Sequence, residues 1–283
     1  MEISIPRTLE AALDELRGEP ETRLLAGGTD LMVAINFGRE RPERIMATRQ
    51  LEELRELRVD GSVRLGAGVP YSRMERELAR STPALAQAAR TIGSPQIRNA
   101  GTVGGNLGTC SPAGDTLPVL AALDAQVVVR SSEQERRVPF TEFMRGPRKP
   151  DLRPGELVVA VEWEPAGPAQ SFLKAGTRNA MVISVAMLAL VIDRQARKVR
   201  AGIGSVAPTI IRPLEAEAFA EGLLDELGWD TASRPTEAAA IKFGELAAQA
   251  TRPIDDVRGT IAYRRHIVKV MAARALARTA ELA

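Results

Sequence analysis

The stretch Gly101-Thr102-Val103-Gly104-Gly105-Asn106-Leu107-Gly108 is the most informative part of the chain, because it places four glycines in eight residues. Glycine exposes its backbone N–H without a side chain and accepts positive φ, so such a loop can bring several donors close to an anionic group. A tight turn between two strands is the alternative interpretation of the same residues. The segment alone leaves both an anion-binding loop and a turn open.

Two common phosphate-binding motifs are excluded by the residues of this stretch. A P-loop ends in Gly-Lys-Ser/Thr, whereas Leu107-Gly108-Thr109 contains no lysine. A Rossmann fingerprint has the spacing G-x-G-x-x-G and opens a long helix, whereas the spacing here is G-x-x-G-G-x-x-G. A nucleotide that binds at this stretch therefore binds in another fold.

Cysteine and histidine are nearly absent, which limits the chemistry of the chain. Cys110 is the only cysteine and His266 the only histidine among 283 residues. One thiolate cannot hold an iron–sulfur cluster, and no Cys/His set exists for zinc. We expect Cys110 to be a small buried or loop residue and His266 to be a surface or partly buried residue of a helix. A bound cofactor is therefore expected to carry any reaction.

Charge and hydropathy exclude several classes of partner. The chain has 38 basic and 36 acidic residues, interspersed, and only 4% aromatics, which argues against nucleic acid and anionic membranes. The longest apolar run, residues 181–192, is too short to span a bilayer. Acidic and basic residues interrupt the N-terminal segment, so no signal peptide is predicted. These features predict a cytoplasmic protein.

A second glycine pair follows a short apolar run near the N-terminus. Residues 24–26 are predicted to form a buried strand that ends at Gly27-Gly28. Thr29-Asp30 supplies good N-cap residues for a helix that begins near Leu31. A strand, two glycines and a helix start favour anion binding, because free N–H groups and the helix dipole point to the same place.

The rest of the chain alternates helices and strands and then becomes helical. Thr8 is predicted to cap one helix and Ser72 another, and residues 146–154 are predicted to form an exposed loop. The final helix, residues 260–282, has basic residues along one side, which predicts a solvated face. The remaining predicted helices are 83–92 and 115–123, with further helices after Arg212 broken near Gly228, Pro235 and Pro253; the predicted strands are 63–68, 126–130, 157–163, 171–175, 183–192 and 199–205.

Three segments together resemble a known family. Residues 24–31, 94–106 and 111–115 are similar to the FAD-binding medium subunit of the molybdenum hydroxylases, the family of xanthine dehydrogenase, aldehyde oxidase and carbon monoxide dehydrogenase. Residues 154–157 and 174–178 also match, so the resemblance covers essentially the whole chain. Three motifs in the same order at these spacings are far more specific than any one of them.

The resemblance implies an α+β fold of the vanillyl-alcohol-oxidase (PCMH) type. It implies two α/β subdomains, residues 1–60 and 61–166, followed by a C-terminal antiparallel sheet with helices, residues 167–283. FAD would lie between the first two subdomains and be covered partly by the third. The length of the chain agrees with this division, because chains of this length usually split into more than one core.

The resemblance also implies roles for individual residues. The first motif would wrap the FAD pyrophosphate with backbone N–H groups, and the second would hold phosphate and ribitol oxygens. Gly93 would approach the flavin ring, Asp115 would bind a hydroxyl-rich part of the nucleotide, and Leu157 would line the adenine side. Lys174 would lie near the flavin or its phosphates, as a cation that favours the anionic reduced form. The full predicted set is Leu25, Ala26, Gly27, Gly28, Thr29, Asp30, Gly93, Thr102, Gly105, Asn106, Thr109, Gly114, Asp115, Leu157 and Lys174, with no catalytic residue and no metal ligand.

The resemblance further implies partners. The chain itself cannot hold molybdenum or [2Fe–2S] centres, so a large molybdopterin subunit and a small [2Fe–2S] subunit are expected, as a dimer of heterotrimers. Electrons would pass from the clusters through FAD to NAD or a quinone. Val182 stands where family members commonly carry an acidic residue near the flavin, which is a departure from the family pattern. The alternatives are a self-sufficient flavin oxidoreductase of the same fold and a non-catalytic nucleotide-binding module.

Overall fold

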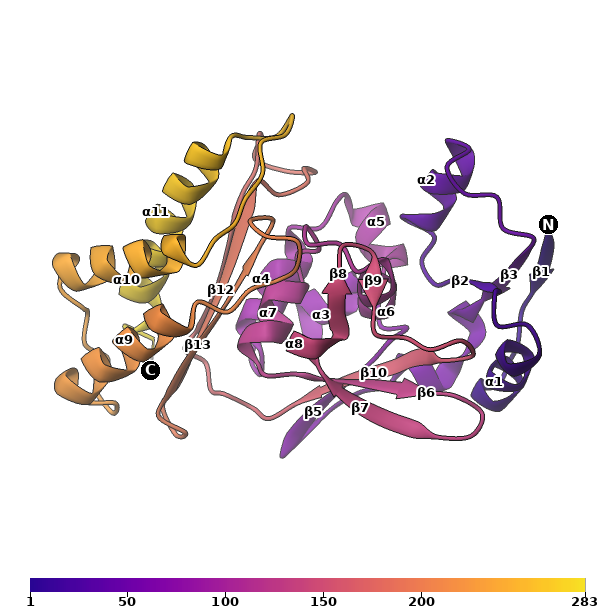
Figure 1. The fold of residues 1–283 in the computed structure, drawn as a ribbon. Helices are drawn as coiled ribbons and strands as arrows, with labels where there is room; N and C mark the ends of the chain where they lie inside the picture. Colours follow the sequence, from indigo (N-terminus) through magenta and orange to yellow (C-terminus); the bar gives the residue numbers. More distant parts are fainter. Residues whose placement is uncertain (283) are drawn as a thin grey trace. The chain divides into compact units, whose positions relative to one another are not determined.

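The computed structural model describes residues 1–282, which form two compact units (Figure 1). Unit 1 contains Met1–Arg73, Ser94–Cys110 and Ala125–Glu164. Unit 2 contains Met74–Gly93, Ser111–Asp124 and residues 165–282. Each unit is therefore assembled from three separate segments of the chain, and the division into domains 1–60, 61–166 and 167–283 stays a prediction.

Unit 1 begins with a small parallel sheet and one amphipathic helix. The strands pair in the order β1-β3-β2. Helix α1 follows β1, and the Thr8 hydroxyl accepts a hydrogen bond from the Ala11 N–H at 3.2 Å, which confirms the predicted cap. Its buried side chains, Leu9, Ala12, Leu13 and Leu16, recur at helical spacing along one face. The elements here are β1 (Glu2–Ser4), α1 (Leu9–Gly18), β2 (Arg23–Leu25), α2 (Leu31–Asn36), β3 (Arg44–Ala47) and the 3₁₀ turns η1 (Thr48–Gln50) and η2 (Glu52–Arg55).

A five-stranded antiparallel sheet forms the rest of the unit 1 core, in the order β4-β5-β10-β6-β7. The central strand β10 pairs Val161 with Leu65 on one side and with Val127 on the other. Because it is covered on both faces, it is a nearly continuous apolar run. Strands β6 and β10 have the predicted boundaries. The strands are β4 (Leu57–Asp60), β5 (Ser62–Gly66), β6 (Gln126–Arg130), β7 (Glu135–Pro139) and β10 (Leu157–Trp163).

The glycine-rich stretch forms a short helix, so its predicted conformation, a loop or a turn, was wrong, while its role in anion binding stays a prediction. Helix α5 (Pro95–Ala100) precedes it, and α6 covers Val103–Thr109. Thr102 caps α6, because its hydroxyl accepts the Gly105 N–H at 3.0 Å. A Cβ on Gly104 would lie 2.7 Å from the Ala67 carbonyl oxygen. Gly104 therefore allows the helix to pack directly on the backbone at Ala67.

Part of the predicted loop 146–154 is a β-hairpin. Strand β8 (Met144–Gly146) pairs with β9 (Lys149–Pro150), after the one-turn helix α8 (Phe140–Phe143). The Arg148 N–H donates to the Cys110 carbonyl at 3.0 Å, which ties the hairpin turn to the end of α6. The segment is ordered by these contacts, a long-range effect that its Pro, Arg and Gly content does not reveal.

Unit 2 is built on the antiparallel sheet β11-β12-β13, with helices on both of its faces. Helices α4 and α7 lie on one side of this sheet and α9, α10 and α11 on the other (Figure 1). Strand β12 is buried on both faces. A Cβ on Gly202 would lie 2.0 Å from the Pro118 carbonyl oxygen, so glycine is needed where α7 meets β13. The elements are α4 (Pro83–Arg90), α7 (Leu117–Ala122), β11 (Gln170–Ala175), β12 (Ala186–Asp193), β13 (Lys198–Gly204), α9 (Leu214–Leu227), α10 (Glu237–Gln249) and α11 (Ile261–Thr279).

Three local predictions differ from the structure. Ser72 lies inside α3 (Tyr71–Glu77) rather than at its cap. The apolar run predicted as a strand from residue 183 enters the sheet only at Ala186. The basic side of α11 is not wholly solvated, because Arg264 is only 2% exposed and donates to the Val185 carbonyl at 3.0 Å and to the Asp256 carboxylate at 2.6 Å.

A membrane span is absent from the part of the chain that the structure describes, since none of its helices is both long and apolar enough to cross a bilayer.

Candidate functional site

The first glycine segment presents a row of unused backbone donors. Strand β2 ends at Leu25 and α2 begins at Leu31. Among residues 1–282, no acceptor pairs with the backbone N–H groups of residues 27–30. Gly28 has φ +72°, a conformation that favours glycine and turns the chain within this segment. Consecutive free N–H groups in a turn of this kind suit an anion.

Gly27 and Asp30 serve this segment in ways that the motif alone did not predict. A Cβ on Gly27 would lie 2.0 Å from the Ala100 carbonyl oxygen, so Gly27 allows the segment to pack against the end of α5. Asp30 occupies the N-cap position of α2, as predicted, but its side chain makes no capping hydrogen bond. The Asp30 carboxylate is therefore directed elsewhere.

The second glycine segment offers fewer free backbone donors than predicted. The Gly104 N–H donates to the Ala67 carbonyl at 2.9 Å, and the Gly105 N–H is held by Thr102. A Cβ on Gly105 would make only ordinary contacts, 3.4 Å to the Thr102 hydroxyl and 3.9 Å to the Ala26 Cβ, so the protein itself does not require glycine there. The Ala26 contact brings the two glycine segments together within unit 1.

A cluster of three polar side chains, Asp30, Thr109 and Arg148, forms a second contact between the two glycine segments. One oxygen of Asp30, Oδ2, lies 3.4 Å from the Thr109 hydroxyl and 3.4 Å from an Arg148 guanidinium nitrogen. Thr109 is at the end of α6, and Arg148 is in the turn of the β8–β9 hairpin. Arg148 was missed by the sequence analysis, because only the fold brings residue 148 to the two motifs.

Unit 2 holds a buried ion pair formed by two predicted residues. Asp115 is 5% exposed and accepts hydrogen bonds from the Lys174 ammonium and, at 2.9 Å, from the Thr91 hydroxyl. Lys174 also donates to the Thr91 carbonyl at 3.3 Å. Burial raises the pKa of Asp115, while the Lys174 charge acts to lower it. The Lys174 charge is thus already paired, and Thr91 is a third member that the sequence analysis missed.

The other predicted residues occupy different local environments. Gly93 has φ +47°, close after α4, and the Gly114 N–H donates to the Ser111 carbonyl at 2.9 Å in a tight turn. Asn106 lies inside α6. Leu157 begins β10 and is 5% exposed, packed in the apolar core beneath α1.

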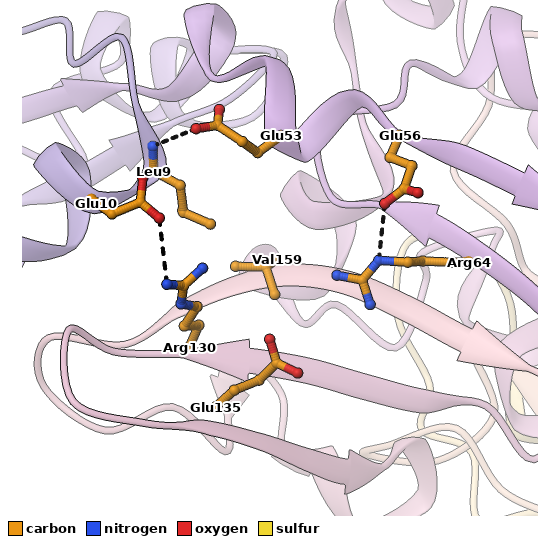
Figure 2. A pocket seen from close by; sticks show the side chains of 8 residues that line it. All are labelled: Leu9, Glu10, Glu53, Glu56, Arg64, Arg130, Glu135 and Val159. Carbon is orange, nitrogen blue, oxygen red and sulfur yellow. Dashed lines mark hydrogen bonds and ion pairs between the residues drawn. The ribbon is translucent and has the colours of Figure 1, made fainter.

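The described cavities are separate from these residues. Figure 2 shows a cavity of about 380 Å³ in unit 1, where Arg130 faces Glu10 at 3.5 Å and Arg64 faces Glu56 at 3.2 Å. A second opening is lined by residues of the loop after β1 and of η1 and η2. In Figure 2, Glu10 pairs with Arg130 and Glu56 with Arg64, whereas the Glu53 carboxylate accepts the Leu9 N–H at 3.0 Å. The eight lining residues are Leu9, Glu10, Glu53, Glu56, Arg64, Arg130, Glu135 and Val159.

Cys110 and His266 have the environments predicted for them. Cys110 is buried, and burial raises the pKa of its thiol to about 11, so it stays protonated and unreactive near neutral pH. His266 is exposed on α11. Over residues 1–282, no three His, Cys, Asp or Glu side chains gather as metal ligands would.

Comparison with known proteins identifies the family. Residues 1–163 match the FAD binding domain in molybdopterin dehydrogenase, and residues 171–279 match the CO dehydrogenase flavoprotein C-terminal domain. The glyceraldehyde dehydrogenase medium chain of Sulfolobus acidocaldarius is 31% identical, and the match covers 95% of this chain and 94% of that one. The xanthine dehydrogenase FAD-binding subunit of Escherichia coli O157:H7 is 29% identical, with 93% and 90% covered.

The fold agrees with this assignment. A chain in the solved structure of reconstituted CO dehydrogenase from Oligotropha carboxidovorans superimposes with a TM-score of 0.89 and 26% identity, covering 100% of this chain and 98% of its own. The predicted fold class is thereby confirmed, and FAD is the cofactor of the matching domain. The chain belongs to the family of FAD-binding medium subunits of the molybdenum hydroxylases, an oxidoreductase family.

Proposed function

We propose that the free N–H groups of residues 27–30 bind the FAD diphosphate, and that the chain is the electron-exit subunit of a molybdenum hydroxylase. The main observation that supports this proposal is that these four consecutive N–H donors have no acceptor within residues 1–282. A diphosphate would satisfy them, and Gly105 presents no side chain beside Ala26 that would hinder its close approach. The other proposed FAD-binding residues are Leu25, Ala26, Gly93, Thr102, Gly105, Asn106, Thr109, Gly114, Asp115, Leu157 and Lys174.

The buried ion pair of Asp115 and Lys174 in unit 2 has a different proposed role, which concerns the flavin rather than the diphosphate. FAD, when bound, supplies a carrier that accepts and releases electrons. Thr91 orients the Asp115 carboxylate, and Asp115 in turn holds the Lys174 ammonium in one position. A lysine that is fixed and partly neutralised by a buried carboxylate offers a weaker positive field than a free cation would. Lys174 would therefore favour the anionic reduced flavin only to the extent that Asp115 leaves its charge uncompensated.

The same proposal extends to partners. The relatives are named as a medium chain and as an FAD-binding subunit, which implies further subunits in those enzymes. We infer a large molybdopterin subunit and a small [2Fe–2S] subunit, in a dimer of heterotrimers, that deliver electrons to FAD. The FAD held by residues 27–30 would supply the carrier from which NAD or a quinone takes these electrons. Substrate recognition belongs to the large subunit.

Purification of the tagged chain from its native source tests this assignment. We expect two further polypeptides to co-purify, with molybdenum and iron in the preparation and flavin in proportion to this chain. In the same anaerobic preparation, bleaching of the flavin by NADH would assign NAD as acceptor, and bleaching by a quinol alone would assign a quinone. A chain that purifies alone and turns over a small organic substrate would instead favour the self-sufficient oxidoreductase.

A further inference from the structure

An acidic side chain stands inside the segment proposed to bind a diphosphate. Asp30 directly follows the free N–H groups of residues 27–29. Neighbouring Cα atoms are about 3.8 Å apart, so a carboxylate at this position lies within roughly one Debye length of a diphosphate held there. Two anions at that separation repel each other. The site therefore requires a means of neutralising Asp30.

The structure supplies a cation beside that carboxylate. The Arg148 guanidinium lies 3.4 Å from Asp30 Oδ2, the same oxygen that faces the Thr109 hydroxyl. No other Lys or Arg side chain within residues 1–282 pairs with Asp30. Neutralisation of the Asp30 carboxylate therefore depends on this one arginine.

The backbone fixes where the arginine stands. The Arg148 N–H donates to the Cys110 carbonyl at 3.0 Å, and the Cys110 thiol contacts the Gly146 carbonyl at 3.8 Å. Arg148 itself has φ +58°, a conformation that is uncommon for a residue with a side chain. Helix α6 and strand β9 are also in contact. These contacts hold the hairpin turn against the end of α6, although the Arg148 side chain is 63% exposed.

We propose that Arg148 is a positioning residue of the FAD site, which neutralises Asp30 so that the adjacent N–H groups can bind the diphosphate. The inference rests on the proposed function, because it presumes that the N–H groups of residues 27–30 bind the FAD diphosphate. Arg148 acts through Asp30 and need not touch FAD itself. The two side chains should therefore be thermodynamically coupled in FAD binding.

The hairpin provides a matched control for this role. Arg145 is three residues earlier, its side chain is also 63% exposed, and it pairs with Asp151 at 3.3 Å instead of with Asp30. Replacing Arg145 by glutamine therefore makes the same chemical change at the same exposure. It removes no charge from beside Asp30.

FAD titration of the full chain, followed by flavin fluorescence, tests the coupling in wild type, Arg148→Gln, Arg145→Gln, Asp30→Asn and the double variant Asp30→Asn with Arg148→Gln. We expect Arg148→Gln to weaken FAD binding about tenfold at low salt, because the Asp30 charge is then uncompensated. The loss should shrink as salt is raised, since the repulsion is screened. Asp30→Asn in the same chain should restore affinity to within about threefold of wild type, and Arg145→Gln should have no effect.

Two results would overturn the inference alone: unchanged affinity in Arg148→Gln, or a loss that Asp30→Asn does not relieve. A wild-type chain that took up no FAD would overturn the proposed function as well. Equal urea midpoints for the apo forms of wild type and Arg148→Gln are required for the comparison. A lower midpoint together with a loss that Asp30→Asn leaves in place would assign Arg148 a structural role, against the proposal.

Discussion

Two glycines of the proposed site are required for different physical reasons. Gly27 is needed because a Cβ there would lie 2.0 Å from a backbone carbonyl oxygen, which cannot move without shifting α5. Gly105 has no such neighbour, because a Cβ there would make only ordinary contacts with Thr102 and Ala26. The motifs predicted both residues for the same purpose, because a sequence does not distinguish a glycine that packs against backbone from one that leaves room for a ligand.

The two glycines should therefore respond differently to substitution. Gly27→Ala is expected to lower the free energy of unfolding by about 2 kcal/mol or more, through overpacking against Ala100. Gly105→Val should leave the urea midpoint of the apo protein nearly unchanged and weaken FAD binding by roughly tenfold or more. Urea denaturation and FAD titration of each variant measure the two effects.

Gly222 provides the control for the second substitution. It lies in helix α9, and a Cβ added there would meet no heavy atom within 4 Å. Gly222→Val therefore adds the same side chain to a helix far from both motifs in sequence. Its FAD affinity should equal that of wild type. If Gly105→Val also binds FAD normally, the role assigned to Gly105 is wrong.

At the scale of elements, the largest prediction error was α6. Four glycines in eight residues have low intrinsic helix propensity, so a loop was the natural expectation. The helix forms because Thr102 caps it and because its backbone packs on Ala67, and the second of these is a tertiary contact. Strands β6 and β10, by contrast, were predicted with their observed boundaries, since short apolar runs rich in valine favour a strand without tertiary information.

Helix α11 shows the same limit for a charged residue. Its basic side was predicted to face solvent, yet Arg264 is buried and connects Asp256 to the carbonyls of Val185 and Ser205. From the sequence alone, an arginine in a helix is predicted to be exposed. Its buried acceptors lie in other segments of the chain, and only the fold shows them. The ion pair with Asp256 fixes the helix to the segment before it. The hydrogen bonds to the Val185 and Ser205 carbonyls fix it to the sheet of unit 2.

This ion pair predicts a pH dependence of stability. Although burial acts to raise it, the pKa of Asp256 is lowered far below its usual range by the Arg258 N–H and by the guanidinium groups of Arg258 and Arg264. A carboxylate whose pKa is lower in the folded than in the unfolded state stabilises the fold above its unfolded pKa of about 3.9. That stability is lost as the pH falls through the folded pKa.

Asp256→Asn should therefore lower the free energy of unfolding by about 2–3 kcal/mol at neutral pH, because Arg264 keeps a buried charge without its partner. The variant should also lose less stability than wild type between about pH 5 and pH 2. Urea unfolding across this pH range measures both, with Asp14→Asn, a change at a 62% exposed carboxylate, as the control. Parallel pH profiles for wild type and Asp256→Asn would contradict this account.

At the scale of the whole molecule, the sequence predicted the family and fold class, and the comparisons confirmed both. The order and spacing of three motifs predicted the family. Neither the composition of the chain nor its hydrophobic periodicity would have done so. The interleaving of the two compact units was not predicted, because patterns read along a chain favour contiguous domains. Arg148 and Thr91 were missed for a related reason, since contacts far apart in sequence bring each of them to its partners.

The FAD content of the purified, desalted chain shows directly whether this subunit binds FAD. Visible flavin absorbance divided by protein concentration, before and after incubation with FAD, gives the number of FAD molecules per chain. We predict one FAD per chain, and an unfolding transition that shifts to higher temperature in its presence, because a ligand that binds only the native state stabilises it. A chain that is folded but neither retains nor takes up FAD would contradict the account.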